Sequence, residues 1–328
     1  MKHAVSIDIG GTRVKWGVVS ETGAAAQKGS EDTQARSGPR GVAEQIAAIV
    51  KRARGNFDIA GVGVGCPGLI DPTRTIDLFS PNLYNPDGTS WRNVPLAALI
   101  QEALGDPSLE VMLENDVNAM TLGEYMYGAG RGVTDMIGMT IGTGIGGGVV
   151  LNGKLYRGAG GMAGEIGHMT VEPKGRLCGC GNFGCLEAMA GKNGIIARTL
   201  EALADDPRPS LLDEHIDALK AMDDRCPEII EDAARKGDAL AANIFAETGR
   251  YIGIALASLA NFLNPQAVVI GGGIANAGNI LFPHIEREIR LRAFRECAEG
   301  MRILPAQHGN DAGMLGAAAL ILNPEAAG

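Results

Sequence analysis

Glycine is clustered between apolar runs in three places, and this pattern limits the possible folds more than any other feature of the sequence. DIGGT at 8–12 and GTGIGGG at 142–148 each lie between apolar, strand-like segments, and GGGI at 271–274 follows the apolar run AVVI. Glycine tolerates positive φ and lets the backbone approach a neighbour closely. The first two clusters therefore predict β-hairpins with glycine turns, and the third predicts a strand that runs into a helix.

Strand-like and helix-like segments alternate along the chain, which predicts an α/β protein. The unit at 136–156 resembles the first hairpin in plan, which indicates two halves of related topology. At 328 residues the chain is long for a single core. We expect a small N-terminal α/β lobe at 1–118, on which a C-terminal helix at 311–328 packs. A larger α/β lobe at 119–310 would carry a cysteine-rich loop.

Composition argues against several classes of partner. The net charge is -9 and no basic run occurs, so nucleic acid and anionic membranes are not expected as partners. Aromatic residues make up only 4%, too few for a surface that stacks exposed bases. The apolar runs are too short for a signal peptide or a membrane helix. We expect a cytoplasmic protein.

The glycine turns suit phosphate binding, because backbone N–H groups converge on an anion where no side chain intervenes. GTGIGG also fits the dinucleotide pattern G-x-G-x-x-G, but an apolar strand follows it here where that pattern needs a helix. Simple tight turns remain the other interpretation. The residues expected to bind the nucleotide are Asp8, Gly10, Gly11, Thr12, Gly142, Thr143, Gly144, Gly146, Gly272 and Gly273.

The segment LEVMLENDVNAM places Asn115 and Asp116 where a predicted strand ends and a helix begins. Ligand crevices of α/β sheets lie at that edge. Phosphoryl transfer to an alcohol needs a carboxylate that orients the hydroxyl and accepts its proton, a role that suits Asp116. Asn115 would bind a neighbouring sugar hydroxyl. Both residue types are also favoured at helix N-caps, so this segment alone leaves that interpretation open.

One histidine and three cysteines follow at the spacing H-x9-C-x-C-x4-C, and this set matches a closed tetrahedral zinc site. Four protein ligands leave no open position, so the sequence predicts a structural Zn²⁺. Free thiols in a loop are the alternative. Glu165 and Glu187 flank the cluster and would bind sugar hydroxyls, together with the second ring nitrogen of the histidine. The predicted zinc ligands are His168, Cys178, Cys180 and Cys185.

Six motifs occur in a fixed order: DIGGT, GCPGLID, ENDVNA, GTGIGGG, EIGHM and CGCGNFGCLE. Together they resemble the ROK family of bacterial sugar kinases and repressors, over essentially the whole chain. The resemblance implies a two-lobed actin/hexokinase-like (ribonuclease H-like) ATPase fold. It implies ATP and Mg²⁺ at the glycine loops, with Asp116 as catalytic base. It places Gly68 and Asn82 near the sugar, beside Asn115, Glu165, His168 and Glu187.

The resemblance implies a glucokinase-like enzyme that phosphorylates a hexose or N-acetylhexosamine, with glucose and its O6 hydroxyl as the first expectation. A homodimer is typical of the family. The alternative is a sugar-binding sensor or regulator without significant turnover. Family repressors carry a helix-turn-helix before the kinase-like body, whereas the first glycine-turn strand begins here by Ala4. That position and the acidic charge favour the kinase.

Overall fold

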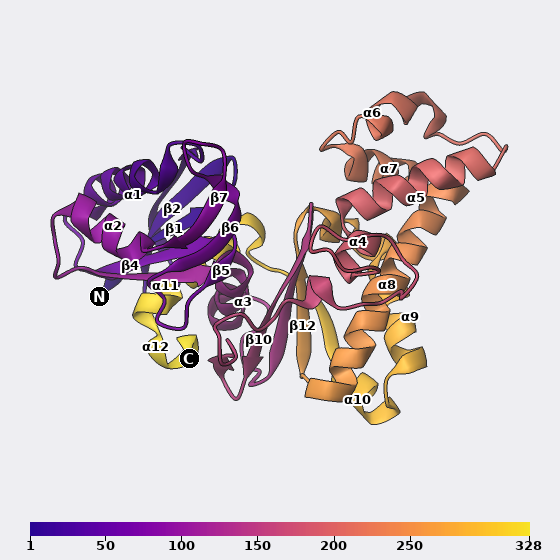
Figure 1. Cartoon of the computed structure of the whole chain (residues 1–328). Helices are drawn as coiled ribbons and strands as arrows, with labels where there is room; N and C mark the ends of the chain where they lie inside the picture. The colour runs from indigo at the N-terminus through magenta and orange to yellow at the C-terminus, as the bar shows by residue number, and fades with distance from the viewer. The chain divides into compact units, whose positions relative to one another are not determined.

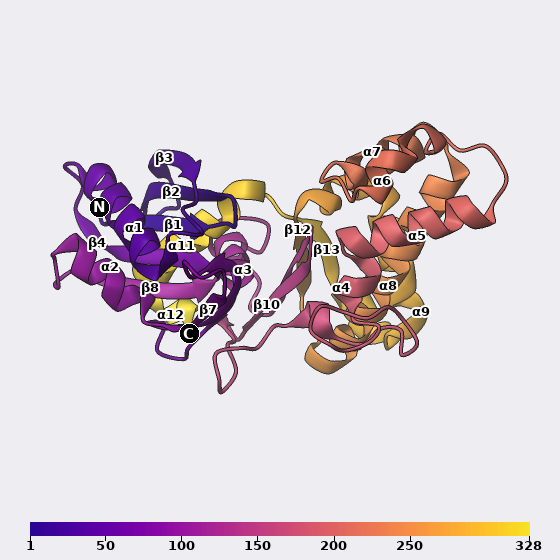
Figure 2. The ribbon, with the colours of Figure 1, turned by 45° about the horizontal axis from the view of Figure 1, so that its top comes forward.

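The computed structural model describes all 328 residues, and they form two compact units. Unit 1 comprises Met1–Gly138, Gly148–Gly164 and Ala306–Gly328, and unit 2 comprises Met139–Gly147 and Glu165–Pro305. Figures 1 and 2 show the helices and strands of each unit. The division into lobes at 1–118 and 119–310 stays a prediction.

The main sheet of unit 1 has the strand order β3-β2-β1-β4-β8. Strand β1 (His3–Ile9) pairs antiparallel with β2 (Arg13–Ser20), and β3 (Ala25–Asp32) extends the sheet beyond β2. On its other side β1 pairs parallel with β4 (Ile59–Cys66), which pairs parallel with β8 (Glu110–Asn115). The first glycine turn therefore lies in a β-hairpin, as predicted. The carboxyl ends of β1, β4 and β8 meet at one edge.

Helices cover both faces of this sheet (Figure 1). Alternate residues of β1 face opposite layers, as the period of two requires. Val5 packs in the core that α1 and α2 complete, whereas Ala4 packs with residues of α11. Helix α11 also packs against α3. The helices of unit 1 are α1 (Gly38–Arg54), α2 (Leu96–Leu104), α3 (Asp116–Tyr127), α11 (Ala312–Leu322) and α12 (Pro324–Ala327).

A small antiparallel sheet lies between β4 and α2 in the sequence. It consists of β5 (Leu69–Ile70), β6 (Asp77–Tyr84) and β7 (Ser90–Val94), in that order. The segment that contains Asn82 is therefore part of a strand, whereas the sequence pattern did not predict one there.

The second main sheet has the order β11-β10-β9-β12-β13. Strands β10 and β11 pair antiparallel, and β12 and β13 pair parallel, which matches β2–β3 and β4–β8 in the first sheet. This correspondence confirms that the two halves have related topology. The unit boundary passes through β9 and β10. The strands are β9 (Met136–Ile141), β10 (Ile145–Leu151), β11 (Lys154–Leu155), β12 (Ala267–Gly271) and β13 (Arg302–Pro305).

Helices make up most of unit 2. The longest, α8, packs against α4, α5, α7 and α9. The α-helices of this unit are α4 (Leu186–Ala190), α5 (Lys192–Asp205), α6 (Ile216–Lys220), α7 (Cys226–Arg235), α8 (Ala239–Leu263), α9 (Phe282–Arg292) and α10 (Arg295–Gly300). Short 3₁₀ helices lie at Ile166–His168, Asp213–His215, Gly273–Ile280 and, in unit 1, Gly309–Asp311. No helix in either unit has the length and apolar character that a membrane span requires.

Helices α3 and α11 approach so closely that only glycine fits at two positions of their contact. A Cβ atom on Gly316 would lie 1.6 Å from the carbonyl oxygen of Ala119, and one on Gly123 would lie 2.2 Å from that of Ala312. Both obstacles are backbone atoms, so no side chain can rotate away. This contact brings the C-terminal helix against the helix that begins at Asp116.

We predict that Gly316→Ala destabilises the protein. Alanine favours a helix over glycine by about 1 kcal/mol, but here it must separate two helices, at a typical cost of about 1–3 kcal/mol or more. The matched control is Gly300→Ala in α10, where nothing lies within 4 Å of the new Cβ. Thermal unfolding followed by circular dichroism should show a lower Tm for Gly316→Ala only. Equal Tm values for the two variants would contradict the packing argument.

Candidate active site

The residues predicted for the site fall into two groups, one in each compact unit. Those in unit 1 are Asp8, Gly10, Gly11, Thr12, Gly68, Asn82, Asn115 and Asp116. Those in unit 2 are Gly142, Thr143, Gly144, Gly146, Glu165, His168, Cys178, Cys180, Cys185, Glu187, Gly272 and Gly273.

Strand register gathers the unit 1 group at one sheet edge. Asp8 on β1 pairs with Gly65 on β4, and Cys66 at the end of β4 pairs with Asn115 at the end of β8. Asp8 and Asn115 thus lie two strand spacings apart, about 10 Å. Asp116 follows directly as the first residue of α3. Two carboxylates therefore stand where α/β sheets bind ligands.

The β1–β2 turn is tight. The N–H of Gly10 donates to the carbonyl of Arg13 at 2.9 Å, and a Cβ on Gly10 would lie 2.9 Å from that same oxygen. Burial raises the pKa of Asp8, and the positive charge of Lys15 opposes that shift. A cation beside Asp8 would stabilise its ionised form, and carboxylate oxygen is the ligand type that Mg²⁺ prefers. The chemistry of this edge therefore fits a hydrated Mg²⁺.

Asn115 is the N-cap of α3. Its Oδ1 accepts from the N–H groups of Val117 at 2.9 Å and Asn118 at 3.0 Å. The cap interpretation left open by the sequence is thus correct for this residue. Its Nδ2 also donates to the carbonyl of Gly68 at 2.9 Å, so the residue joins the helix start to the loop after β4. Asp116 is not the cap. Its Oδ1 lies 2.9 Å from the N–H of Val117.

Gly68 and Asn82 lie close to these residues. A Cβ on Gly68 would lie 2.1 Å from the carbonyl oxygen of Phe79, and its φ is 139°, so the position requires glycine. A Cβ on Gly11 would lie 3.7 Å from the Cβ of Asn82, which places Asn82 beside the DIGGT turn. The structure thus brings both residues to the unit 1 part of the predicted site.

The charges of four carboxylates act on the thiol at the end of β4. Burial raises the pKa of the Cys66 thiol well above its usual value, and the charges of Asp77, Asp116, Asp8 and Glu114 raise it further. The thiol therefore stays protonated. Of the four acids, the sequence singled out only Asp8 and Asp116.

The four predicted zinc ligands of unit 2 converge. Their ligand atoms all lie within 4.8 Å of one another. His168 ends a 3₁₀ turn, Cys185 precedes α4, and a short bridge between Thr170 and Cys185 joins the two segments. Glycine is required within the loop, because a Cβ on Gly184 would lie 1.6 Å from the carbonyl oxygen of Glu172. All six cysteines of the chain are free of disulfides.

The spacing of these atoms fits a tetrahedral metal. Zn–S and Zn–N bonds of the usual lengths put two sulfurs about 3.8 Å apart and a sulfur and a nitrogen about 3.6 Å apart. The Sγ atoms of Cys180 and Cys185 are 3.7 Å apart, and Nδ1 of His168 is 3.6 Å from Sγ of Cys178. A disulfide would need sulfurs at about 2.05 Å. The Cys3His set therefore has the chemistry and the dimensions of a structural zinc site.

Glu187 joins the cluster to the second glycine loop. Its Oε2 accepts from the N–H of Ile145 at 3.0 Å, and a Cβ on Gly144 would lie 2.3 Å from that oxygen. Its Oε1 lies 3.9 Å from Sγ of Cys178. One carboxylate thus contacts both the predicted phosphate loop and a predicted zinc ligand.

Glu165 lies on the other side of His168. Its Oε2 is 3.9 Å from Nε2 of His168, the ring nitrogen that Nδ1 ligation would leave available. Burial raises the pKa of Glu165, the His168 charge lowers it, and the Glu187 charge raises it. Glu165, His168 and Glu187 therefore form one polar group within unit 2.

The other glycines of unit 2 also form close backbone contacts. The N–H of Gly142 donates to the carbonyl of Gly144 at 2.9 Å, and the carbonyl of Gly142 accepts from the N–H of Lys192 at 3.0 Å. Gly272 has a φ of 90°, and its Cβ would lie 2.4 Å from the carbonyl oxygen of Ile141. Gly273 begins a 3₁₀ helix after β12, so the strand of the third cluster runs into a helix as predicted.

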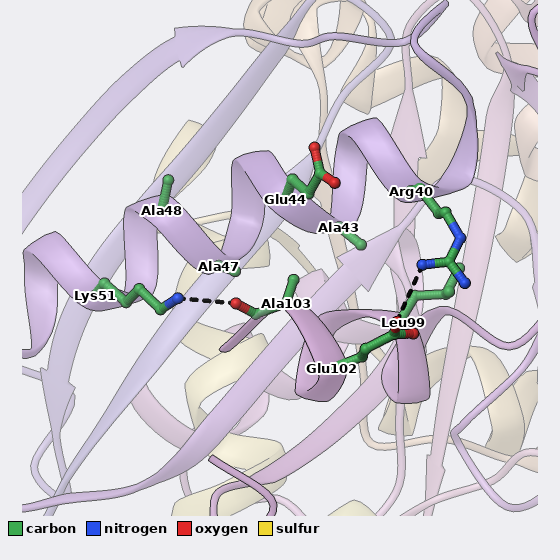
Figure 3. Close-up of a pocket in the computed structure, with 9 residues that line it drawn as sticks. All are labelled: Arg40, Ala43, Glu44, Ala47, Ala48, Lys51, Leu99, Glu102 and Ala103. Atoms are coloured by element: carbon green, nitrogen blue, oxygen red, sulfur yellow. Dashed lines mark hydrogen bonds and ion pairs between the residues drawn. The ribbon is translucent and has the colours of Figure 1, made fainter. Parts of the chain in front are cut away.

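A cavity of about 170 Å³ in unit 2 contains residues that the sequence did not single out. Arg176 and Asn193 line it together with Thr143, Cys178 and Glu187. Arg176 lies two residues before Cys178, and Asn193 lies in the first turn of α5. Neither belongs to a sequence motif that indicates ligand binding. Two larger hollows contain no predicted site residue. One of about 410 Å³ lies between α1 and α2 (Figure 3), and one of about 600 Å³ adjoins α9, α10 and β13.

Comparisons with known proteins agree on one family. Residues 4–323 match the model of the ROK family. A glucokinase of Halalkalibacterium halodurans is 36% identical over 98% of this chain and 95% of that protein. A ROK family glucokinase from Streptomyces griseus, solved with glucose and AMPPNP, is 35% identical over 97% and 99% of the two chains, with a TM-score of 0.79.

A regulator is also among the relatives. The xylose repressor of Caldicellulosiruptor bescii is 31% identical over 81% of this chain and 63% of the repressor. The predicted α/β fold of the actin-like ATPase and hexokinase type is confirmed by the similarity to a solved ROK glucokinase and a solved ROK hexokinase. The match across nearly the whole chain also confirms the resemblance that the six motifs indicated, and the chain belongs to the ROK family.

Proposed function

We propose that this chain transfers the terminal phosphoryl group of ATP to a hydroxyl of a hexose, with glucose and its O6 as the first candidate. Its class, a sugar kinase, is supported by glucokinases that match over nearly their full length. The observation that carries the chemistry is the position of Asp116, at the edge where β1, β4 and β8 end, which also carries Asp8.

Asp116 is the base in this proposal. It orients the sugar hydroxyl and accepts its proton as the new P–O bond forms. Asn115, fixed by its cap and by Gly68, and Asn82 bind neighbouring hydroxyls from unit 1. Glu165, His168 and Glu187 bind further hydroxyls from unit 2, because carboxylates form charge-assisted hydrogen bonds with them.

The glycine loops hold the phosphates of the nucleotide. Asp8, Gly10, Gly11 and Thr12 do so in unit 1, and the backbone of the 142–146 loop does so in unit 2, with Gly272 and Gly273 beside the nucleoside. Mg²⁺, when bound, offsets the charge that develops on the transferring group. Asp8 positions it through water. Excluding water from the loaded site limits ATP hydrolysis.

A sugar-sensing regulator is the second candidate, because a xylose repressor is among the relatives. The presence of a carboxylate at position 116 favours the kinase, since a sensor needs no base. Three reduced cysteines in one cluster suit a reducing compartment, so we place the protein in the cytoplasm.

We predict that Asp116→Asn lowers kcat for glucose phosphorylation by about 10²–10⁴-fold, the usual contribution of a general base. Asparagine keeps the size of the side chain, so glucose affinity should change little. ADP release coupled to a reporter enzyme measures kcat, and calorimetry measures glucose binding. Asp205→Asn, at the exposed end of α5, is the control. An Asp116→Asn enzyme that binds glucose and keeps near-wild-type kcat would show that the base lies elsewhere.

We propose that His168, Cys178, Cys180 and Cys185 hold one structural Zn²⁺, which fixes Glu165, His168 and Glu187 for sugar binding. We predict about one zinc per chain in protein purified without added metal. Cys180→Ser should lose the metal and raise the KM for glucose, because the loop would no longer fix these side chains. Cys297→Ser, outside the cluster, should keep the zinc and the wild-type KM for glucose. Elemental analysis and steady-state kinetics measure these effects. A wild-type protein that contains no zinc and has full activity would contradict the zinc proposal.

We propose that the chain forms a homodimer through the C-terminal ends of α8 and α9. Phe262, Leu291 and Phe294 are 84%, 66% and 74% exposed, and the N–H of Phe294 donates to Oδ1 of Asn261 at 2.8 Å, so the two phenylalanines flank one contact. Exposed apolar patches of this kind mark protein contacts.

We predict that Phe262→Glu combined with Phe294→Glu shifts the protein from dimer to monomer in sedimentation velocity. Leu211→Glu, at another exposed apolar residue of unit 2, should leave the dimer intact. A monomeric wild type would contradict the proposed dimer. If the double variant is still a dimer, the interface does not involve Phe262 and Phe294.

A further inference from the structure

A fully buried carboxylate precedes the proposed catalytic pair. Glu114, the last residue but one of β8, has no exposed side-chain surface. Its Oε2 lies 2.8 Å from Nε of Arg157 and 3.1 Å from Nε of Arg74. These two arginine side chains are only 8% and 11% exposed. One carboxylate therefore joins two guanidinium groups in the interior of unit 1.

The other oxygen of Glu114 contacts the start of α3. Oε1 accepts from the backbone N–H of Asn115 at 3.0 Å and from Nδ2 of Asn118 at 3.1 Å. The carboxylate thus holds the residue before Asp116 and the residue two positions after it. Glu114 therefore helps to hold the turn in which β8 becomes α3.

Arg157 carries this contact to the segment that follows Gly68. Its Nη1 donates to the carbonyl of Pro72 at 3.1 Å, and its Nη2 donates to that of Asp71 at 3.0 Å. The segment is itself rigid. The Asp71 carboxylate accepts from the hydroxyl of Thr73 and from the N–H groups of Thr73, Thr75 and Ile76. Burial raises the pKa of Asp71, but these hydrogen bonds bring it below its usual value.

These contacts close a ring. Asp71 lies three residues after Gly68, and the carbonyl of Gly68 accepts a hydrogen bond from the side chain of Asn115. The backbone N–H of Asn115 donates in turn to Glu114, so Asn115 is held at both its side chain and its backbone. The path runs from Glu114 through Arg157 to the 70–72 segment, back along the chain to Gly68, and through Asn115 to Glu114. A loop residue, Gly161, packs on the same segment, since its Cβ would lie 2.6 Å from the carbonyl oxygen of Ile70.

A gain in stability does not by itself explain why Glu114 is buried with Arg74 and Arg157. Removing charges from water is costly, and buried ion pairs are often replaceable by apolar residues without loss of stability. Glu114 lies two residues before Asp116, and Arg157 binds Asp71, which lies three residues after Gly68. This location is better explained by a requirement for exact orientation of side chains that bind substrate.

We propose that Glu114 and Arg157 are positioning residues for phosphoryl transfer: the pair fixes Asn115 and Asp116 relative to the Gly68 loop. The inference rests on the proposed kinase function. Neither residue touches substrate. Losing the pair should lower kcat with little change in the KM for ATP, since small misplacement of a reacting group costs one to two orders of magnitude in rate.

The test compares Arg157→Gln, Arg157→Lys and Arg74→Gln with the wild type. Glucose and ATP kinetics are measured at a temperature at which thermal unfolding shows each variant to be folded. We expect Arg157→Gln to lower kcat at least about tenfold and Arg157→Lys, which keeps the charge, to recover part of the loss. Arg74→Gln removes a guanidinium from the same oxygen, but its other bonds go to Ala327 and Gly328, so its kcat should fall less for a similar loss in Tm.

Asn118→Ala covers the case in which the Arg157 variants do not fold. It removes one hydrogen bond to Oε1 of Glu114 and leaves the ion pairs, so we expect a folded enzyme with a severalfold lower kcat. If the Arg157 and Asn118 variants have a lowered Tm but a wild-type kcat, the positioning role is wrong. The ion pairs of Glu114 would then serve stability alone. A wild type without turnover on any hexose would instead overturn the proposed function, and the inference with it.

Discussion

The parallel pairing of β1, β4 and β8 is the constraint on which the unit 1 part of the site depends. Because these strands run in the same direction and in the observed register, Asp8, Cys66 and Asn115 reach one edge together. Helix α3 then begins at once, which sets Asp116 at that edge. The close contact with α11 at Gly123 and Gly316 holds α3 in place.

Local patterns of the sequence predicted the parts that depend on neighbours along the chain. The glycine turns, the helix that begins at Asp116 and the Cys3His spacing are of this kind, since turn conformation, capping and a metal loop are decided within a few residues. The related plan of the two halves was visible as repeated strand-glycine-strand units. The family resemblance added Gly68 and Asn82, whose proximity to Asn115 and Gly11 no local pattern indicates.

The Glu114 cluster could not be predicted in the same way. Arg74 and Arg157 are separated from Glu114 by dozens of residues, and a charged residue in a sequence is normally read as solvated. Only the fold shows that these three side chains share one buried oxygen. The same holds for Glu187, whose hydrogen bond with the N–H of Ile145 joins residues 42 positions apart and links the carboxylate proposed for sugar binding to the predicted phosphate loop.

We propose above all that a phosphoryl group passes from ATP to a sugar at the sheet edge that carries Asp8 and Asp116. ³¹P NMR of the protein with ATP, Mg²⁺ and a panel of hexoses and N-acetylhexosamines tests it most directly, because it identifies the product as well as the turnover. We predict that a sugar 6-phosphate forms at the same rate as ADP for at least one sugar, with glucose as the first candidate. Sugar binding without any phosphosugar would contradict it and identify the chain as a sensor.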